Sequence, residues 1–336
     1  FQAEDGIRDI HCSLVGSEMC IRDSGVVGIS IGDSVGAQLE VGGDHGFVDV
    51  IGVDGLIDPI LADFVETRLE QAQLDGARAI VLRMESAGVA VDDETMDRLV
   101  AAVDRSTAPV SVWLGPAGNG EAAGRGVELA LTASSVGVSP GSELELSDGR
   151  RLGYDELLAL GSVEGIPVQD APVLLNHLLE LPEFDFQVYE PGDELPTGQI
   201  VGDAPVRVPL TSTRLIGLPL VERQFHTFAS PPVAYLLFVI GLGLLVFELF
   251  TAGVGIAGVI GAGCLLAGSY GLAVLDARWW AVVVLVVAFL AFAVDVQAGI
   301  QQFWSGVGAV GLLIGSILLL PDHSIGWLPL IVGVAG

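Results

Sequence analysis

The chain offers few side chains that could carry out chemistry on a substrate. Ser86 follows an apolar segment, and a serine in such a strand-end loop could act as a nucleophile. A serine alcohol stays a weak nucleophile until a base takes its proton. The chain contains no lysine: all 14 basic residues are arginines, which keep their proton near neutral pH. Mechanisms that need a lysine base, a lysine dyad or a Schiff base are therefore excluded.

The histidines and a short acidic run give no complete catalytic or metal-binding pattern. His45, His177 and His226 are far apart in the sequence and match no triad signature, so we expect structural or surface roles for them. The acidic run 92–94 stands where a helix should begin, and we interpret it as a cap that complements the helix dipole. We expect no metal and no cofactor.

Two acids in apolar segments are candidates for a function inside a membrane. Glu248 and Asp295 lie at or near the ends of hydrophobic stretches and have no basic neighbour in the sequence. Intramembrane acids often mark ion or proton pathways, which would suit a transporter or channel subunit. Alternatively, both carboxylates reach the headgroup level, because small or polar residues follow soon after each of them.

Alternating strands and helices over residues 47–141 would position Ser86. Apolar β-branched segments predict strands over 48–56, 79–84, 110–114 and 135–138, and apolar periodicity predicts helices over 59–75, 92–106 and 121–132. This alternation predicts a parallel sheet with right-handed crossovers. The site of such a sheet lies in the loops at the carboxyl ends of its strands, which here are 85–91, 115–120 and 139–141.

The segments on either side of this unit are less regular. Residues 1–24 resemble translated sequencing-adapter read-through, so we leave them, with Cys12 and Cys20, out of the fold prediction. Residues 25–46 are expected to be a leader or linker. Residues 142–230 are expected to be an extension and linker, with possible short helices at 152–160 and 172–181 and turns between short strands over 187–208.

From Val233 onward the chain is almost continuously apolar. These residues include one arginine (Arg278), no lysine and four acids, and a spanning helix needs about 20 apolar residues. The predicted spans are 233–250, 254–275, 279–296, 306–320 and a fifth, cut short, from 326. We therefore expect a multi-pass protein of the cell membrane, in contact with the lipid bilayer. Small residues recur four apart and predict close helix packing: Gly263, Ala267, Gly271, and again Gly311, Gly315.

The part of the chain before the spans is strongly acidic. Residues 25–229 carry 33 acidic residues and 11 arginines. Such a surface repels nucleic acid and anionic lipid headgroups, so no nucleic-acid partner is expected.

The chain resembles the NfeD family, in the long form that joins a ClpP-class (SppA-like) protease domain to a membrane block. The resemblance rests on the runs VDVIGVDGLIDP, AIVLRMESAG and APVSVWLGPAG, and above all on FHTFASPPVAYLLFVIGLGLLVFELFTAGVGIAGVIG. It covers about residues 47–141 and 206–336. It implies a ClpP/crotonase-like α/β spiral domain at 47–141 and an all-α transmembrane bundle at 231–336.

Active members of this family are membrane serine endopeptidases with a Ser–Lys dyad. Their serine lies in a segment of the form P-x-G-A-x-A-x-S-A-G, which begins here at Pro116 and includes Gly118 and Gly120. The nucleophile position falls on Ala123, and no serine lies between Ser111 and Ser134. The dyad lysine does not exist in this chain.

A second motif of the family has also changed. The oxyanion-side motif D-[ST]-P-G-G reads Glu85-Ser86-Ala87-Gly88-Val89 here, so only Ser86 and Gly88 remain. Valine at the second glycine adds bulk and restricts the backbone. Without nucleophile and base, only the residual effect of substrate binding and an oxyanion hole would remain. These changes predict a degenerate, inactive protease domain; the alternative is an endopeptidase that uses a non-standard nucleophile such as Ser86.

The resemblance implies a role with partners of the stomatin (SPFH) type in membrane organisation or quality control. It also implies self-association of the ClpP-like domain and an extracytoplasmic position for it. Arg278 alone would favour the cytoplasmic side, since positive residues accumulate there; we follow the family. The hypothesis from sequence is thus a membrane scaffold or adaptor.

Overall fold

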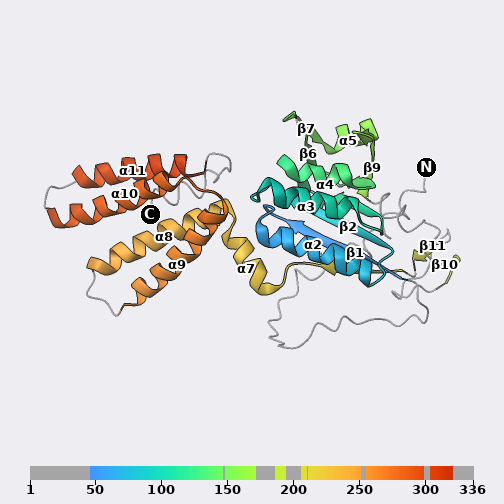
Figure 1. The fold of residues 1–336 in the computed structure, drawn as a ribbon, viewed down its shortest axis with the longest axis horizontal. Coiled ribbons are helices and arrows are strands. Elements are labelled where there is room, and N and C mark those ends of the chain that lie inside the picture. Colours follow the sequence, from blue (N-terminus) through green and yellow to red (C-terminus); the bar gives the residue numbers. More distant parts are fainter. Residues whose placement is uncertain are drawn as a thin grey trace.

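The computed structural model describes residues 46–146, 148–171, 186–193, 206–209, 211–250, 255–298 and 303–320. An α/β domain is followed by helix α7 (Leu220–Phe228) and then by long apolar helices in two hairpins. Figure 1 shows α7 between the α/β domain and the hairpins. His45, His177, the expected helix at 172–181 and the expected fifth span lie outside the described residues.

The α/β domain is built on a mainly parallel sheet, as predicted from the alternation. Its centre holds the parallel strands β1 (Phe47–Asp54), β2 (Ala79–Ser86), β3 (Val110–Leu114) and β5 (Ser135–Val138), paired in that order. Helices α2 (Pro59–Leu74) and α3 (Asp93–Asp104) connect these strands. The sheet and its helices bury one large apolar core, in which Ile51, Leu82 and Leu114 are inaccessible to solvent.

Side-chain caps fix where the two connecting helices begin. The Leu61 N–H donates to Asp58 Oδ1 (2.8 Å), and Pro59 follows at the first helical position. The Thr95 N–H donates to Asp92 Oδ1 (2.8 Å). The interpretation of the acidic run as a cap is therefore confirmed for Asp92, and both helices begin where the sequence predicted.

The expected helix over 121–132 is wrong in its first half. Strand β4 (Glu121–Ala122) pairs with the end of β2 on one side and with β6 (Glu143–Glu145) on the other. A single 3₁₀ turn (Gly124–Gly126) and the short helix α4 (Val127–Thr132) follow. Residues 121–122 form a strand because they pair with β2 and β6, and this pairing outweighs their local preference for a helix.

Residues 142–230, expected as an extension and linker, contribute further strands to the same sheet. Beyond β6 they supply β7 (Arg151–Gly153), β8 (Ser162–Val163), β9 (Ile166–Asp170) and β12 (Ser212–Ile216), with helix α5 (Tyr154–Leu160) among them. Strand β12 lies parallel to β1 at the opposite edge from β8. A separate pair, β10 (Phe186–Tyr189) and β11 (Val206–Pro209), is antiparallel, as the expected short strands of 187–208 suggested.

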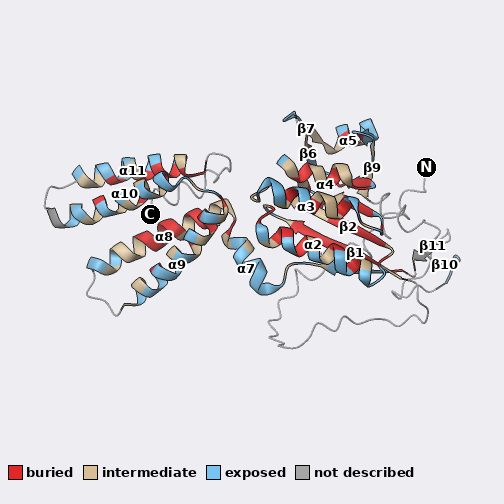
Figure 2. Ribbon diagram, viewed as in Figure 1, coloured by how far each residue is buried: buried red, intermediate tan, exposed pale blue. Residues whose placement is uncertain are grey.

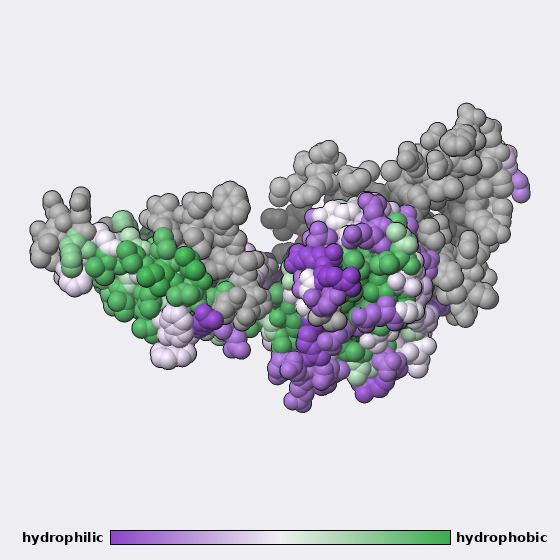
Figure 3. Space-filling model, turned by 90° about the horizontal axis from the view of Figure 1, so that it is seen from above, coloured by the Kyte–Doolittle hydropathy of each residue, from purple (hydrophilic) through white to green (hydrophobic). Residues whose placement is uncertain are grey.

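The helices after α7 match the first four predicted spans closely. They are α8 (Pro231–Phe250), α9 (Ile256–Val274), α10 (Trp279–Ala298) and α11 (Phe303–Leu319). Among the described residues, α8, α9 and most of α10 are long and apolar enough to cross a membrane, and α11 is apolar but shorter. The outward faces of these helices expose large apolar side chains. Figure 3 shows the hydrophobic surface of the helical part in green, and Figure 2 shows its exposed and intermediate residues in pale blue and tan. Such surfaces suit lipid rather than water.

Glycines let the helices of each hairpin approach closely, although not at every predicted position. A Cβ at Gly268 would lie 2.5 Å from the Phe238 backbone nitrogen, and one at Gly315 would lie 2.9 Å from the Leu285 side chain. At Gly263, in contrast, an added Cβ meets nothing within 4 Å among the described residues. The predicted small-residue spacing thus holds for Gly271 and Gly315 but not for Gly263, which faces away from α8.

Candidate functional site

The predicted strand-end loops come together at the carboxyl ends of the central strands. Gly118 N–H donates to Pro140 O (2.8 Å), and the missing Cβ of Gly141 would lie 3.1 Å from the Gly118 Cα. Gly118 has φ of +90°, which favours glycine, and a Cβ at Gly120 would overlap the backbone of Leu114. The loops 115–120 and 139–141 therefore approach each other backbone to backbone, and side chains at Gly120 and Gly141 would meet backbone atoms.

Ala123 lies beside Ser86 at this end of the sheet. The Ala123 N–H donates to Ser86 O (3.2 Å), and Ala123 is 4% exposed. It directly precedes the 3₁₀ turn that leads into α4. The position to which the family resemblance assigns the nucleophile thus holds a buried methyl group, which cannot act as a nucleophile.

Ser86 is fully buried, and its hydroxyl already has a partner. The Ser86 Oγ–H donates to Gly88 O (3.1 Å), which closes the loop on itself. A nucleophile must reach a substrate atom, so this hydroxyl would first have to lose its bond and gain access. The arrangement matches that of a loop-closing serine.

Valine in the second motif packs inward and fills space. Val89 contacts the apolar core, and its Cγ2 would lie 3.8 Å from a Cβ placed on Gly126. Ile57 pairs with this loop on the other side, since Ile57 N–H donates to Gly88 O (3.0 Å) and Ala90 N–H donates to Ile57 O (2.8 Å). The Gly88 carbonyl therefore accepts bonds from two groups, and the loop is fixed as part of the fold.

Glu85 is the titratable group nearest to Ser86 along the chain. Partial burial and the charge of Asp54 raise the pKa of Glu85, against the opposing effects of Arg83 and of a hydrogen bond with Asn119. Successive residues of a strand point to opposite faces. Glu85 and Ser86 therefore face away from each other across β2, and this carboxylate does not serve as a base for the Ser86 hydroxyl.

Sequence reasoning missed two serines and a tryptophan beside these loops. The Trp113 Nε1–H donates to Ser139 Oγ (2.8 Å), and Ser142 is buried, with no hydrogen-bond partner for its hydroxyl among the described residues. No motif of the sequence singled out either serine. A buried hydroxyl without a partner is uncommon, which makes Ser142 the polar group of this region whose role the fold alone does not explain.

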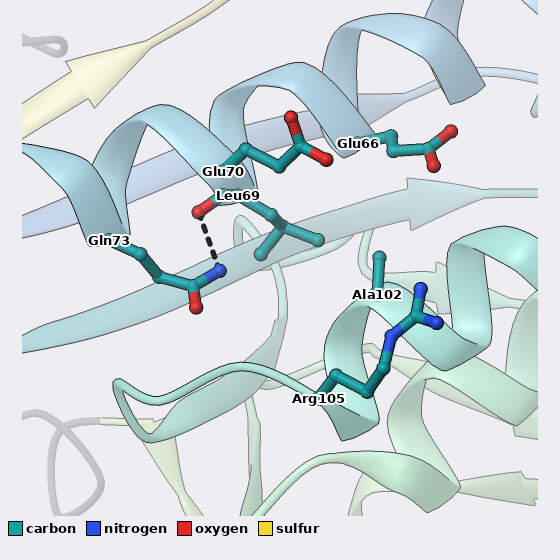
Figure 4. Close-up of a pocket in the computed structure, with 6 residues that line it drawn as sticks. All are labelled: Glu66, Leu69, Glu70, Gln73, Ala102 and Arg105. Atoms are coloured by element: carbon teal, nitrogen blue, oxygen red, sulfur yellow. Dashed lines mark hydrogen bonds between the residues drawn. The ribbon is translucent and has the colours of Figure 1, made fainter.

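A hollow on the domain surface lies elsewhere, between α2 and α3. Figure 4 shows its lining, with the Gln73 amide donating to Leu69 O (2.9 Å). Glu66, Glu70 and Arg105 surround it, and none of the strand-end loops contributes to it. Its lining includes no serine or histidine, and it is separate from the strand-end loops.

Each predicted intramembrane acid caps the helix that follows it. The N–H groups of Gly255 and Gly258 donate to Glu248 Oε1 (3.0 Å) and Oε2 (3.3 Å) at the start of α9. The Trp304 N–H donates to Asp295 Oδ1 (3.1 Å) at the start of α11, as the Ser305 hydroxyl does to Oδ2 (2.6 Å). The first N–H groups of a helix have no partner within the helix, and its dipole favours a negative charge there. In both hairpins, therefore, a carboxylate near the end of the first helix caps the start of the second.

A comparison with protein families identifies the helical part of the chain. Residues 232–336 match the model of the NfeD integral membrane domain. This helical part is therefore similar to the NfeD integral membrane domain. The resemblance deduced from the sequence is confirmed for this part, and the chain is an integral membrane protein.

Comparisons with whole proteins and solved structures were also made. A search of curated proteins found no match. Among solved structures, the chain is similar to the 1510-N membrane protease specific for a stomatin homolog from Pyrococcus horikoshii (17% identity, 54% of this chain, 98% of that chain, TM-score 0.39). It is also similar to a mutant of the 1510-N membrane-bound stomatin-specific protease in complex with a substrate peptide (17% identity, 53% and 95% covered, TM-score 0.37).

Removing one capping carboxylate of the NfeD membrane domain tests its structural role. Asp295→Ala is expected to destabilise the α10–α11 hairpin by about 1–2 kcal/mol, because the amide of Trp304 loses its acceptor. Asp295→Asn should cost less, since its amide oxygen still accepts one bond. Thermal unfolding in detergent would measure both variants. Equal stability of Asp295→Ala and the wild type would contradict a capping role.

His226 holds helix α7, which precedes the membrane domain, against the α/β domain, a contact that the sequence did not indicate. Its Nε2–H donates to Asp54 O (2.8 Å), and its Nδ1 lies 3.1 Å from Asp58 Oδ1. The second contact has an ion-pair distance without the alignment of a hydrogen bond. Burial alone would lower the pKa of His226, but the Asp58 carboxylate and the Asp54 carbonyl reverse this and raise it. A doubly protonated ring satisfies both contacts.

This junction is expected to be stronger at mildly acidic pH. Because the pKa of His226 is raised above 6.5 in the folded state, its contribution is fully present below 6.5 and disappears as pH rises through the folded value. Thermal unfolding of the wild type and of His226→Gln should thus differ most below pH 6.5. Asp58→Asn is the control, since asparagine still caps α2 but carries no charge. A difference that grows with pH would contradict this assignment.

Proposed function

We propose that the chain is a non-catalytic membrane scaffold or adaptor whose α/β domain is a degenerate serine-protease domain of the ClpP class. The observation that carries the proposal is Ala123 at the nucleophile position, in a chain without lysine. A Ser–Lys dyad needs both groups, and loss of either one typically lowers the rate by orders of magnitude. The chain lacks both, so no residue pair can take over the reaction by a small shift in alignment.

The buried state of Ser86 supports the proposal further. Its hydroxyl donates to the Gly88 carbonyl, and the neighbouring acid Glu85 faces the other side of the strand. The two serines beside the loops are no better placed: Ser139 accepts the Trp113 indole N–H, and Ser142 is 1% exposed. The geometry suits a domain that keeps the shape of a hydrolase and has lost its chemistry.

A stomatin-type protein is the partner that we propose. Its basis is the resemblance to long NfeD proteins together with the NfeD membrane domain at 232–336. An adaptor recognises its partner through the retained shape of the α/β domain and needs no turnover. We further propose that this domain self-associates and lies on the extracytoplasmic side of the membrane. The role would be in membrane organisation or quality control.

A serine-directed probe tests the loss of activity. The purified full chain in detergent is expected to show no labelling by a fluorophosphonate and no cleavage of casein, because Ser86 is buried and its hydroxyl is bonded to the Gly88 carbonyl. An active serine protease in the same assay is the positive control, and Ser86→Ala should behave like the wild type. Labelling that disappears in Ser86→Ala would instead establish an endopeptidase with a non-standard nucleophile.

A binding experiment tests the adaptor role separately. The full chain, immobilised in nanodiscs, should capture a purified stomatin-like protein, and the Ser86→Ala variant should capture it equally well. Equal capture is expected because the proposed interaction uses the surface of the domain and not the Ser86 hydroxyl. Absence of capture by both forms would remove the adaptor proposal even if the chain proves inactive. Proton flux in liposomes that Glu248→Gln abolishes would favour transport instead.

A further inference from the structure

Helix α7 has two different faces, and its apolar face is only partly covered by the rest of the protein. All nine residues of α7 are described, and none of them is buried. Leu220, Val221 and Phe225 expose 69%, 70% and 44% of their surface. At 100° per residue these three side chains fall within one arc of the helix, and Arg223 and His226 fall on the other side.

The polar side of α7 is held by the α/β domain. His226 contacts the Asp54 carbonyl and the Asp58 carboxylate at the start of α2, and its side chain is only 14% exposed. A Cβ on Gly55 would lie 3.0 Å from the His226 ring, which shows how closely the two parts approach. The rotation of α7 about its axis is therefore fixed, and its apolar side must face away from the domain.

The C-terminal end of α7 is held by the membrane helices. The Phe225 ring packs edge-on against Tyr270 of α9, with centroids 5.4 Å apart. Gly271 lies against the Phe228 carbonyl oxygen. Tyr270 is about one turn from the end of α9 at Val274, and α8 begins only three residues after α7 ends. These contacts place α7 at the level where α8 and α9 leave the hydrocarbon core.

We propose that α7 lies flat in the boundary between lipid headgroups and acyl chains, with Leu220, Val221 and Phe225 inserted into the bilayer that surrounds α8 and α9. The surface of α7 is continuous with these spanning helices, so the same lipid that covers them reaches the apolar side of α7. Helix α7 thus anchors the α/β domain close to the bilayer.

The attraction is apolar rather than electrostatic. Glu222 and Arg223 give this helix one negative and one positive charge, and the preceding chain is strongly acidic. A negatively charged surface does not attract anionic headgroups. Insertion of α7 should therefore be as strong in zwitterionic phosphatidylcholine as in a mixture that contains anionic lipid, and it should not depend on salt.

Site-specific labelling of the full chain in nanodiscs tests this proposal. Val221→Cys and the matched control Arg223→Cys, in a background with the native cysteines replaced by serine, would each carry an environment-sensitive fluorophore. Spin-labelled phosphatidylcholine should quench the label at residue 221 several-fold more than the label at residue 223. The circular dichroism and size-exclusion profile of each labelled form should match those of the unlabelled protein.

Each other outcome overturns the proposal. Equal and weak quenching at both positions would show that α7 is surrounded by water. A blue-shifted label at 221 that lipid does not quench would show that protein covers this side, either a second copy or another part of the chain. Quenching that requires anionic lipid and disappears at high salt would show electrostatic docking in place of apolar insertion.

Discussion

Replacing Arg214 by alanine is expected to destabilise the α/β domain by about 3 kcal/mol and to release strand β12 from the sheet. Asp49 on β1 is 1% exposed, and the Arg214 guanidinium donates to both of its carboxylate oxygens (2.6 and 2.8 Å). Arg214 also lies over the Phe47 ring, 3.6 Å from its centroid. Removal of Arg214 would leave a buried carboxylate with its main counter-charge lost.

The release of β12 would be visible far from the substitution. Strand β12 is the last strand before α7, and it pairs with β1 from Phe47 to Ile51. Loss of the Asp49–Arg214 pair should therefore increase hydrogen–deuterium exchange in β12 and along β1, while β3 and β5 keep their protection. Exchange measured by mass spectrometry on the full chain in detergent would separate these strands.

A second substitution provides the control for the Arg214 result. Asp49→Asn combined with Arg214→Ala removes the buried charge together with its partner, so the double variant should be more stable than Arg214→Ala alone. Arg150→Ala is the matched surface control, because Arg150 forms an exposed pair with Asp148 and should change the free energy of unfolding by less than about 1 kcal/mol. Equal stability of Arg214→Ala and Arg150→Ala would show that the pair with Asp49 contributes little.

Local features of the fold were predictable because their causes are local. The caps at Asp58 and Asp92 depend on a side chain and an amide three residues later, so the sequence places them directly. The apolar runs of β3 and β5 are buried on both faces, and their bounds agree with the prediction. The same holds for α8–α11, since the length of a spanning helix is set by the bilayer.

Features that depend on distant partners could not be predicted. Strand β12 is largely exposed, and it forms by pairing with β1, where Arg214 meets Asp49, 165 positions away in the sequence. Glu121 and Ala122 read as helical until β2 and β6 are placed on either side of them. Long-range pairing outweighs local preference in both places.

Some features of the candidate site could likewise be predicted from the sequence, and others needed the fold. The resemblance to the NfeD family implies that the nucleophile position falls on Ala123, and composition alone excludes a lysine base. The burial of Ser86 and its bond to Gly88 needed the fold. The sequence singled out Glu248 and Asp295 as candidates for a function inside a membrane. In the structure the contacts of each carboxylate are helix caps at the start of the next helix.

The packing of the NfeD membrane domain gives the second large prediction. Gly271→Ala is expected to destabilise the folded protein by more than about 3 kcal/mol, because the new methyl group would overlap the Phe228 carbonyl oxygen at the start of the α8–α9 hairpin. That oxygen belongs to the backbone of Phe228, the last residue of α7, so it cannot move aside as a flexible side chain would. The expected result is a large loss of folded, monodisperse protein after extraction in detergent.

Gly263→Ala makes the same chemical change on the same helix, but it should stabilise the folded protein where Gly271→Ala destabilises it. An added Cβ at residue 263 meets nothing within 4 Å among the described residues, and alanine is favoured over glycine in a helix by about 0.8–1.0 kcal/mol. Thermal unfolding of the two variants side by side therefore separates packing from helix propensity, because propensity alone would stabilise both. If Gly271→Ala proved as stable as Gly263→Ala, the backbone contact between α9 and the α7–α8 junction would not exist. The inference that α9 holds α7 at the membrane boundary depends on that contact, so this pair of variants also tests the geometry on which the anchoring of the α/β domain rests.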